Sequence, residues 1–212
     1  MTTYSVLNIQ HKAQSTFCLR VERPNTPIKS GQCFNVGIPG MDINREYSMY
    51  SAAEAPYLEF LIRVIDGGLV SSHLGKLRVG DAVEVDGPYG EFCISPEKLH
   101  SNFVFIGSGT GVAPFHSFVK TYPNLNYTVL HGIRYANEAY DSGDYQDGKY
   151  IACISQNDNG ASMRVTDYLR FNPISKDSIV YLCGNRNMII DAVQILLDQG
   201  ISGDQIISEV FF

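Results

Sequence analysis

The chain has 212 residues, 44% apolar and 18% charged, a composition typical of globular proteins and enough for one medium domain or two small ones. Its 16 basic and 22 acidic residues give a net charge of -6, so a general nucleic-acid-binding protein is not expected. No apolar run approaches the roughly 18 residues that cross a bilayer, and the amino terminus lacks the regions of a signal peptide, so neither a membrane span nor secretion is expected. The five cysteines include no C-x-x-C pair, which argues against a zinc site, an iron–sulfur cluster or a disulfide framework and favours the cytoplasm.

The first half of the chain consists of short extended segments rich in Val, Ile, Phe and Tyr, separated by turn-forming glycines and prolines such as Gly87–Gly90. One short helix, Val70–Leu77, interrupts them. Closure removes exposed strand edges, so this spacing predicts a small closed antiparallel barrel, with a sandwich as the alternative. The predicted strands are Tyr4–His11, Thr16–Glu22, Gln32–Ile38, Glu46–Ser51, Leu58–Ile65 and Ala82–Val85.

From residue 102 onward, apolar strands alternate with helices, a pattern that predicts a parallel α/β sheet covered on both faces. A seam near Ser95–Ser101 therefore divides the chain into domains 1–98 and 99–212. The segment Tyr140–Lys149 is the most loop-like of this half. The predicted strands are Phe103–Ile106, Tyr127–His131, Ile151–Ile154, Ile179–Cys183 and Ile206–Val210, and the predicted helices are Pro114–Thr121, Val165–Phe171 and Met188–Gln199.

A glycine-rich turn, Gly107–Pro114, joins the first strand of this half to the helix after it. Glycines let the backbone approach a ligand closely, and a helix amino terminus offers N–H groups and a positive dipole end, so the turn is suited to a pyrophosphate. The spacing GxGxGxxP differs from the usual GxGxxG fingerprint, and a tight turn without a ligand is the alternative interpretation.

Two further segments could seat an anion in the first half. Arg45–Ser51 (REYSMYS) places a guanidinium fork, an aromatic ring and hydroxyls on one strand, with Arg45 and Tyr47 on the same face. Gly67–Leu74 places a glycine turn and a serine at the start of a helix. Taken singly, the first segment is more simply interpreted as a surface arginine beside a core tyrosine, and the second as an ordinary helix cap. Taken together with the glycine-rich turn, the two segments favour two phosphate-bearing ligands.

In this order, the motifs resemble the ferredoxin–NADP reductase superfamily. The resemblance covers nearly the whole chain and rests on RxYSxxS (Arg45–Ser51), VSSHL at the helix start, GDxVxVxGPxG (Gly80–Gly90), GxGxGxxP (Gly107–Pro114), CGN (Cys183–Asn185) and the terminal EVFF. It implies a flavin-binding antiparallel barrel followed by a nicotinamide nucleotide domain. The compact link before Arg45 resembles the bacterial branch, and Tyr140–Lys149 replaces what the family usually builds as a helix.

The resemblance also implies roles for individual residues. Arg45 and Ser71 would bind the flavin pyrophosphate, Tyr47 would contact the isoalloxazine, and Ser48 would lie beside flavin N5. Phe211 would cover the flavin ring, with Phe212 as the competing candidate. The flavin set is completed by Ser51, Arg63, Gly68, Leu69 and Val70. The nicotinamide nucleotide would be held by Gly107, Gly109, Thr110, Gly111, Cys183, Gly184 and Asn185, and the catalytic set would be Ser48, Cys183, Glu209 and Phe211.

The implied activity is hydride transfer between NAD(P)H and FAD, followed by single-electron transfer to a carrier such as ferredoxin or flavodoxin, in a cytoplasmic monomer. Arg134 and Arg164 match two family positions that bind the 2′-phosphate of NADPH. The third family position carries a Ser-Arg pair, which reads Ser155-Gln156 in this chain. Two cations still favour NADPH over NADH. A flavin reductase acting on free flavin and a non-catalytic electron-transfer subunit of a larger complex are the alternatives.

Overall fold

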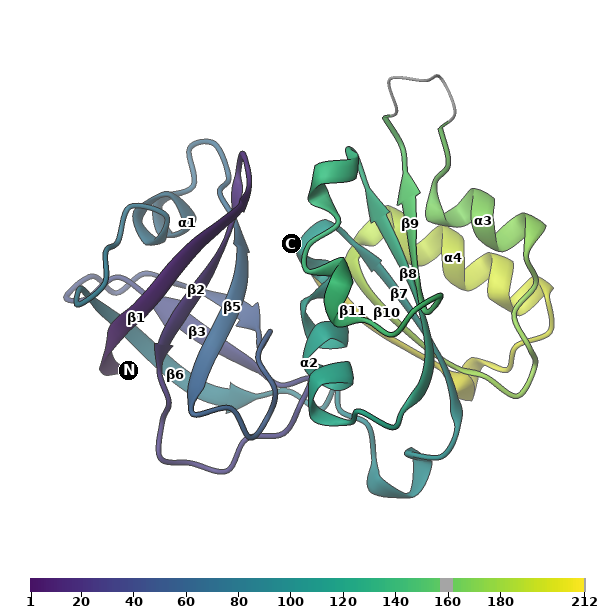
Figure 1. Ribbon diagram of the computed structural model, residues 1–212, viewed down its shortest axis with the longest axis horizontal. Coiled ribbons are helices and arrows are strands. Elements are labelled where there is room, and N and C mark those ends of the chain that lie inside the picture. Colours follow the sequence, from purple (N-terminus) through teal and green to yellow (C-terminus); the bar gives the residue numbers. More distant parts are fainter. Residues whose placement is uncertain (157–161, 212) are drawn as a thin grey trace. The chain divides into compact units, whose positions relative to one another are not determined.

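The structure, a computed structural model, describes residues 1–156 and 162–211 and divides into two compact units (Figure 1). Unit 1 contains Met1–Cys93 and His116–Thr121, and unit 2 contains Ile94–Phe115 and Tyr122–Phe212. Within the described ranges, the helices are too short or too polar to cross a membrane.

Unit 1 is built on six antiparallel strands in the order β4-β3-β6-β1-β2-β5. The two outer strands are also joined, because Met49 bridges Phe60 and the Tyr50 N–H donates to the Glu59 carbonyl at 2.7 Å. The sheet therefore closes into the predicted barrel rather than a sandwich. The strands are β1 (Thr2–Ala13), β2 (Thr16–Glu22), β3 (Cys33–Gly37), β4 (Asn44–Ser48), β5 (Tyr57–Arg63) and β6 (Ala82–Tyr89).

The barrel interior is filled by side chains from alternate positions of these strands, among them the fully buried Phe17, Phe34 and Phe60. The helix α1 (Leu69–Leu74) adds Val70 and Leu74, which lie one turn apart and belong to the same core cluster. The position of α1 against the barrel is thus set by the burial of its apolar face.

Several predicted boundaries in this unit were wrong, among them the end of the helix, which stops at Leu74 instead of Leu77. The strand predicted over Glu46–Ser51 ends at Ser48, because the chain turns there to bond with β5 and close the barrel. The turn predicted at Gly87–Gly90 lies mostly within β6, which continues to Tyr89 opposite Cys33. The register of β3 and β6 shifts at this point, and such an irregularity accommodates a proline within a strand.

Unit 2 contains five parallel strands in the order β11-β10-β7-β8-β9, as predicted from the alternation of strands and helices. The strands are β7 (Asn102–Ser108), β8 (Asn126–Ile133), β9 (Tyr150–Ile154), β10 (Ile179–Asn185) and β11 (Ile206–Phe211). The α-helices that follow β7 are α2 (Ala113–Thr121), whose residues from His116 onward belong to unit 1, and α3 (Val165–Phe171) and α4 (Arg186–Asp198) of unit 2. The short 3-10 turns are η1 (Pro96–Lys98), η2 (Gly109–Val112), η3 (Ala136–Glu138), η4 (Ser142–Asp144) and η5 (Gly203–Gln205).

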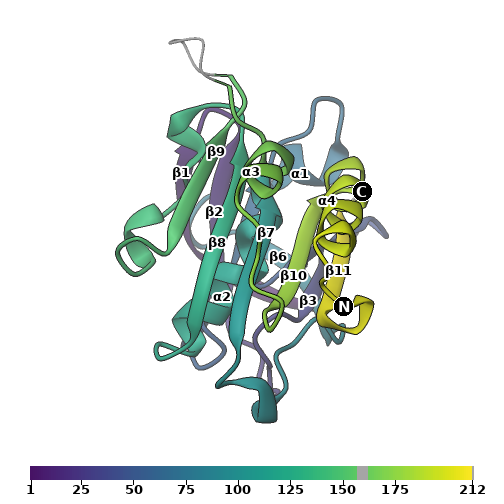
Figure 2. The same cartoon turned by 90° about the vertical axis from the view of Figure 1, so that its right-hand side faces the viewer.

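The two faces of this sheet are covered differently. Figure 2 shows α3 and α4 on one face, where they pack on aliphatic strand residues such as Ile106 and Leu130. The other face is aromatic, and Phe115 of α2 stacks on Phe105 with ring centroids 5.1 Å apart. Residues 134–149, all of them described, contain η3 and η4 but no α-helix. The segment Tyr140–Lys149, predicted to be the most loop-like of this half, therefore forms no α-helix.

Candidate functional site

The connections of unit 2 reverse direction between two neighbouring strands. From β7 the chain continues to β8 and β9 on one side, whereas β10 and β11 lie on the other. Ligands of open α/β sheets bind at the carboxyl ends of the strands at such a switch point. The glycine-rich turn follows β7, and Cys183–Asn185 ends β10. The structure thus brings together two segments that are more than 70 residues apart in the sequence.

Glycines allow the two segments to touch. A Cβ at Gly111 would overlap the carbonyl oxygen of Cys183, and a Cβ at Gly184, where φ is +126°, would overlap the Ser108 hydroxyl. The same hydroxyl accepts a hydrogen bond from the Asn185 N–H at 2.9 Å. Gly107 is also crowded, since its Cβ would lie 3.2 Å from the Gly111 carbonyl oxygen.

Gly109 is the exception among these glycines. Its φ is +55°, and a Cβ built there would meet nothing within 4 Å. The turn is therefore tightly packed on the side of β10 and open at Gly109–Thr110. An open backbone turn at the start of a helix is a suitable seat for a phosphate group, so the fit to the expected pyrophosphate is good.

The carboxyl ends of β10 and β11 bring the other predicted residues to this edge. In the parallel pairing, Glu209 lies opposite Cys183, and Phe211 lies opposite Asn185. Cys183 is fully buried, and burial, together with the nearby Glu209 carboxylate, raises the pKa of its thiol well above the usual value. The thiol is therefore uncharged at neutral pH. Phe212 lies outside the described residues.

Asn185 has a structural task at this edge. Its side-chain oxygen caps α4 by accepting hydrogen bonds from the N–H groups of Asn187 and Met188, at 3.0 and 3.3 Å. The cap fixes the direction in which the chain leaves β10, so Asn185 orients the strand end whether or not its amide also contacts a nucleotide.

His131 was missed by the sequence analysis, although it ends a predicted strand. Its side chain is fully buried, with Nε2 2.7 Å from the Gly109 carbonyl oxygen and Nδ1 2.7 Å from the Tyr150 hydroxyl. Burial lowers its pKa to about 4, outweighing the opposite effect of the Gly109 carbonyl. A histidine directly after the apolar pair Val129–Leu130, at the end of the predicted strand, was the available signal.

The two predicted coenzyme arginines flank the same edge of the sheet. Arg134 follows β8 and is exposed, and its backbone carbonyl accepts a hydrogen bond from Gln156. Arg164 is exposed at the start of α3, directly after Met163, whose N–H bonds to the β9 carbonyl of Ile154. Both guanidinium groups therefore come from segments beside the end of β9.

In unit 1, three of the predicted flavin residues lie on β4. Arg45 is exposed, and one of its guanidinium nitrogens donates to the Asn44 carbonyl at 2.7 Å. Tyr47 is half-buried against the barrel core, with its ring 6.5 Å from that of Phe60. Burial raises the pKa of Tyr47 to about 12, although Arg45 acts in the opposite direction, so its hydroxyl stays protonated. Ser48 is buried at the end of the strand.

The predicted anion seat at α1 lies at the start of a short helix. The first hydrogen bond within this helix runs from the Ser72 N–H to the Gly68 carbonyl. The N–H groups ahead of it, at the helix start, belong to Leu69, Val70 and Ser71. These donors and the Arg45 guanidinium are the groups that a diphosphate requires, so the residues present fit a flavin dinucleotide.

Two predicted flavin residues also make hydrogen bonds within the fold. The Ser71 hydroxyl accepts the Ile65 N–H at 3.1 Å and so closes the turn before α1. The Ser51 hydroxyl accepts the Glu59 N–H at 3.2 Å and so supports the closure of the barrel. Arg63 is half-buried at the end of β5.

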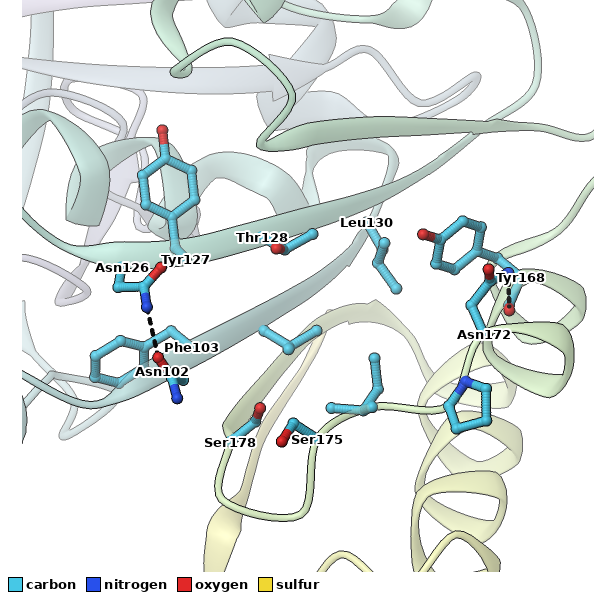
Figure 3. A pocket seen from close by; sticks show the side chains of 13 residues that line it. Asn102, Phe103, Asn126, Tyr127, Thr128, Leu130, Tyr168, Asn172, Ser175 and Ser178 are labelled. Atoms are coloured by element: carbon cyan, nitrogen blue, oxygen red, sulfur yellow. Dashed lines mark hydrogen bonds between the residues drawn. The ribbon is translucent and has the colours of Figure 1, made fainter.

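A cavity of about 320 Å³ lies at the opposite edge of the sheet of unit 2, under the loop that follows α3 (Figure 3). Two of its polar side chains donate to neighbouring groups: the Asn126 amide to the Asn102 side chain, and the Asn172 amide to the Tyr168 carbonyl. It opens beside the amino-terminal ends of β7 and β8, so it is separate from the glycine-rich turn.

Comparisons with known proteins agree with the two-domain organisation. Residues 7–94 match the family model described as "Oxidoreductase FAD-binding domain", and residues 105–194 match the one described as "Oxidoreductase NAD-binding domain". The chain belongs to the ferredoxin–NADP reductase superfamily. The expected order of a flavin-binding and a nucleotide-binding domain is thereby confirmed.

The proteins that this chain resembles include electron transfer and reductase components of oxygenases and a ferredoxin NADP+ reductase. The chain is 26% identical to the toluate 1,2-dioxygenase electron transfer component of Pseudomonas putida, over 93% of the chain and 63% of the relative. It superposes on the Amycolatopsis cytochrome P450 reductase GcoB with a TM-score of 0.87 and 26% identity, covering 99% of this chain and 69% of GcoB. The ferredoxin NADP+ reductase of Neisseria gonorrhoeae, solved with FAD and NADP, shares the fold at a TM-score of 0.84 and 22% identity, covering 100% of this chain and 98% of that one. The chain spans less than two thirds of the length of curated relatives such as the first of these.

Proposed function

We propose that this protein is an FAD-dependent oxidoreductase that transfers hydride between NAD(P)H and the flavin and passes single electrons to or from a carrier protein. One observation carries the proposal. The glycine-rich turn, the end of β10 and the end of β11 meet at the switch point of a nucleotide-binding sheet, in a chain whose other unit matches an FAD-binding domain. We take residues 1–98 and 99–212 as the two domains.

In this proposal, the barrel binds FAD through hydrogen-bond donors and one aromatic ring. Arg45 and the start of α1 (Gly68, Leu69, Val70 and Ser71) bind the pyrophosphate, with Arg63 and Ser51 nearby, and Tyr47 contacts the ring system. When bound, the flavin supplies the two-electron to one-electron conversion. Ser48 would donate a hydrogen bond beside flavin N5, and the role expected for Phe211, with Phe212 as the competing candidate, is to cover the ring.

The nucleotide domain then orients the coenzyme. Gly107, Gly109, Thr110 and Gly111 hold its pyrophosphate, and Gly184 and Asn185 hold the strand end beside it. Cys183 and Glu209 face the nicotinamide, where the uncharged thiol packs without attracting water. Hydride transfer requires donor and acceptor atoms roughly 3–3.5 Å apart, so the role of these residues is orientation.

NADPH is the proposed coenzyme. The support is the placement of two exposed guanidinium groups, Arg134 and Arg164, beside the end of β9, where they can bind a 2′-phosphate. The third family position, Ser155-Gln156, offers only uncharged donors, so the two arginines bear the selectivity.

Replacing Arg134 with alanine is expected to lower kcat/KM for NADPH roughly 10- to 100-fold, the equivalent of one charged hydrogen bond, and to leave kcat/KM for NADH unchanged. Steady-state reduction of ferricyanide with each coenzyme measures both values. Arg170→Ala is the matched control, because Arg170 is an exposed arginine of α3 paired with Asp167 at 3.2 Å. An equal loss with both coenzymes in Arg134→Ala contradicts the assignment.

A ferredoxin- or flavodoxin-like carrier is the proposed partner. The P. putida relative is named as an electron transfer component of a dioxygenase, and a Rhodococcus jostii relative as the reductase component of propane 2-monooxygenase. These names support a second candidate, in which the chain delivers electrons to an oxygenase component. The proposed state is a cytoplasmic monomer.

The visible spectrum of the purified protein tests the proposal. A yellow protein whose flavin band bleaches on anaerobic addition of NADPH is the expected result. A colourless protein that takes up no added FAD contradicts the proposal. FAD that dissociates on each turnover indicates a flavin reductase, and a monomer on gel filtration that holds FAD but reduces no dye indicates a non-catalytic subunit.

A further inference from the structure

The buried imidazole of His131 connects the glycine-rich turn to β9. A carbonyl oxygen can only accept a hydrogen bond, so the 2.7 Å contact to Gly109 requires a proton on Nε2 of His131. With that proton in place, the uncharged ring accepts at Nδ1, and Tyr150 donates its hydroxyl at 2.7 Å. The chain of donors therefore runs from Tyr150 through His131 to Gly109.

This contact determines how one peptide group of the turn is oriented. In a trans peptide, the carbonyl and the following N–H point in opposite directions. The Gly109 carbonyl points inward to His131, so the Thr110 N–H points away from the interior. Gly109 begins the short 3-10 turn η2 with a φ of +55°, and a Cβ built there would meet nothing within 4 Å, so the contact with His131 adds to the restraint that the turn itself places on this peptide group.

We propose that His131 is a positioning residue that, supported by Tyr150, holds the Gly109–Thr110 peptide with its N–H directed toward the coenzyme pyrophosphate. The inference rests on the proposed function, because it assumes that a pyrophosphate binds at the turn. A peptide in the opposite orientation would present its carbonyl oxygen to the anion and repel it.

Neighbouring aromatic side chains hold the His131 ring and its two hydrogen bonds in place. The ring is enclosed by aromatic side chains, with the Tyr140 and Tyr150 rings 5.9 and 5.8 Å away. Tyr140 comes from the segment that replaces a helix between β8 and β9, and Tyr150 begins β9 immediately after it. The replaced helix is thus compensated by aromatic side chains that cover the imidazole and exclude water from its hydrogen bonds.

The test compares two substitutions at this position by calorimetric titration with NADP+ and NAD+. His131→Leu removes the donor, and both affinities are expected to fall about tenfold, the equivalent of one buried hydrogen bond. Both fall because the pyrophosphate is common to the two nucleotides. His131→Gln keeps an N–H that can reach the Gly109 carbonyl and is expected to restore most of the affinity. Tyr150→Phe is expected to cause a smaller loss than His131→Leu.

If His131 served only to stabilise the fold, its replacement would not affect coenzyme binding selectively. The flavin reduction rate at saturating NADPH is expected to stay unchanged in His131→Leu, so the loss is confined to binding. Leu130→Ala is the matched control, because Leu130 is fully buried on the opposite face of the same strand. It is expected to lower the melting temperature without changing either affinity.

Two negative results are distinguishable. If the wild-type protein binds neither nucleotide, the proposed function is overturned. If the wild type binds and His131→Leu binds equally well, or if His131→Gln loses as much affinity as His131→Leu, this inference alone is overturned. If His131→Leu does not fold, the affinities of Tyr150→Phe and His131→Gln test the inference instead. The inference is then overturned if Tyr150→Phe binds both nucleotides as tightly as the wild type while His131→Gln no longer binds them.

Discussion

Replacing Gly111 with alanine is expected to destabilise the protein by about 3 kcal/mol, because the new methyl group overlaps backbone atoms and the neighbours cannot simply rotate away. The Cβ would overlap the Cys183 carbonyl oxygen and lie 2.7 Å from the Gly184 Cα. Relief requires the turn and the end of β10 to separate. Because both segments hold the coenzyme in the proposed function, a shift of about 1 Å is expected to reduce kcat/KM for NADPH about 100-fold.

Urea unfolding and steady-state kinetics measure these two effects. Gly143→Ala is the matched control, because a Cβ at this glycine meets nothing within 4 Å, and it is expected to change neither value. A Gly111→Ala protein with wild-type stability would mean that the turn does not contact the end of β10 as described.

Replacing Ser48 with alanine is expected to lower the rate of flavin reduction by roughly 100-fold, the usual effect of removing one hydrogen-bond donor aimed at a reacting group. The affinity for the coenzyme is expected to stay nearly constant, because Ser48 belongs to the barrel and not to the nucleotide domain. Stopped-flow reduction over a range of NADPH concentrations separates the limiting rate from the affinity.

The control for Ser48 is another buried serine of the same unit. Ser30 bonds to Ser117, with the two hydroxyl oxygens 3.0 Å apart, and Ser30→Ala is expected to cost about 1 kcal/mol of stability without changing the reduction rate. Unchanged turnover in Ser48→Ala would remove Ser48 from the catalytic set.

Strand and helix positions were mostly predictable, because they depend on local patterns of apolar residues. The alternation in Leu58–Arg63 and the apolar run before Gly107 correspond to β5 and β7. The errors fall where a distant partner overrides local preference. β6 continues through Gly87 and Pro88 because β3 pairs with it, and β4 stops at Ser48 because the chain turns toward β5.

For the glycine-rich turn, by contrast, the sequence predicted the motif but not which residues it packs against. The type of ligand expected there follows from composition and position alone, since glycines ahead of a helix offer N–H groups to an anion. That Gly111 packs on Cys183 while Gly109 stays open depends on the pairing of β7 with β10, which no local pattern encodes.

The amino-acid sequence by itself determined the two-part architecture and the candidate phosphate seats, because hydrophobic periodicity and turn chemistry are properties of neighbouring residues. Only the tertiary structure decided that the ends of β7, β10 and β11 form one edge, and that a buried histidine from β8 holds the turn at Gly109. Strand order and side-chain burial arise from contacts between residues far apart in the chain, so they emerge only when the whole sheet has formed.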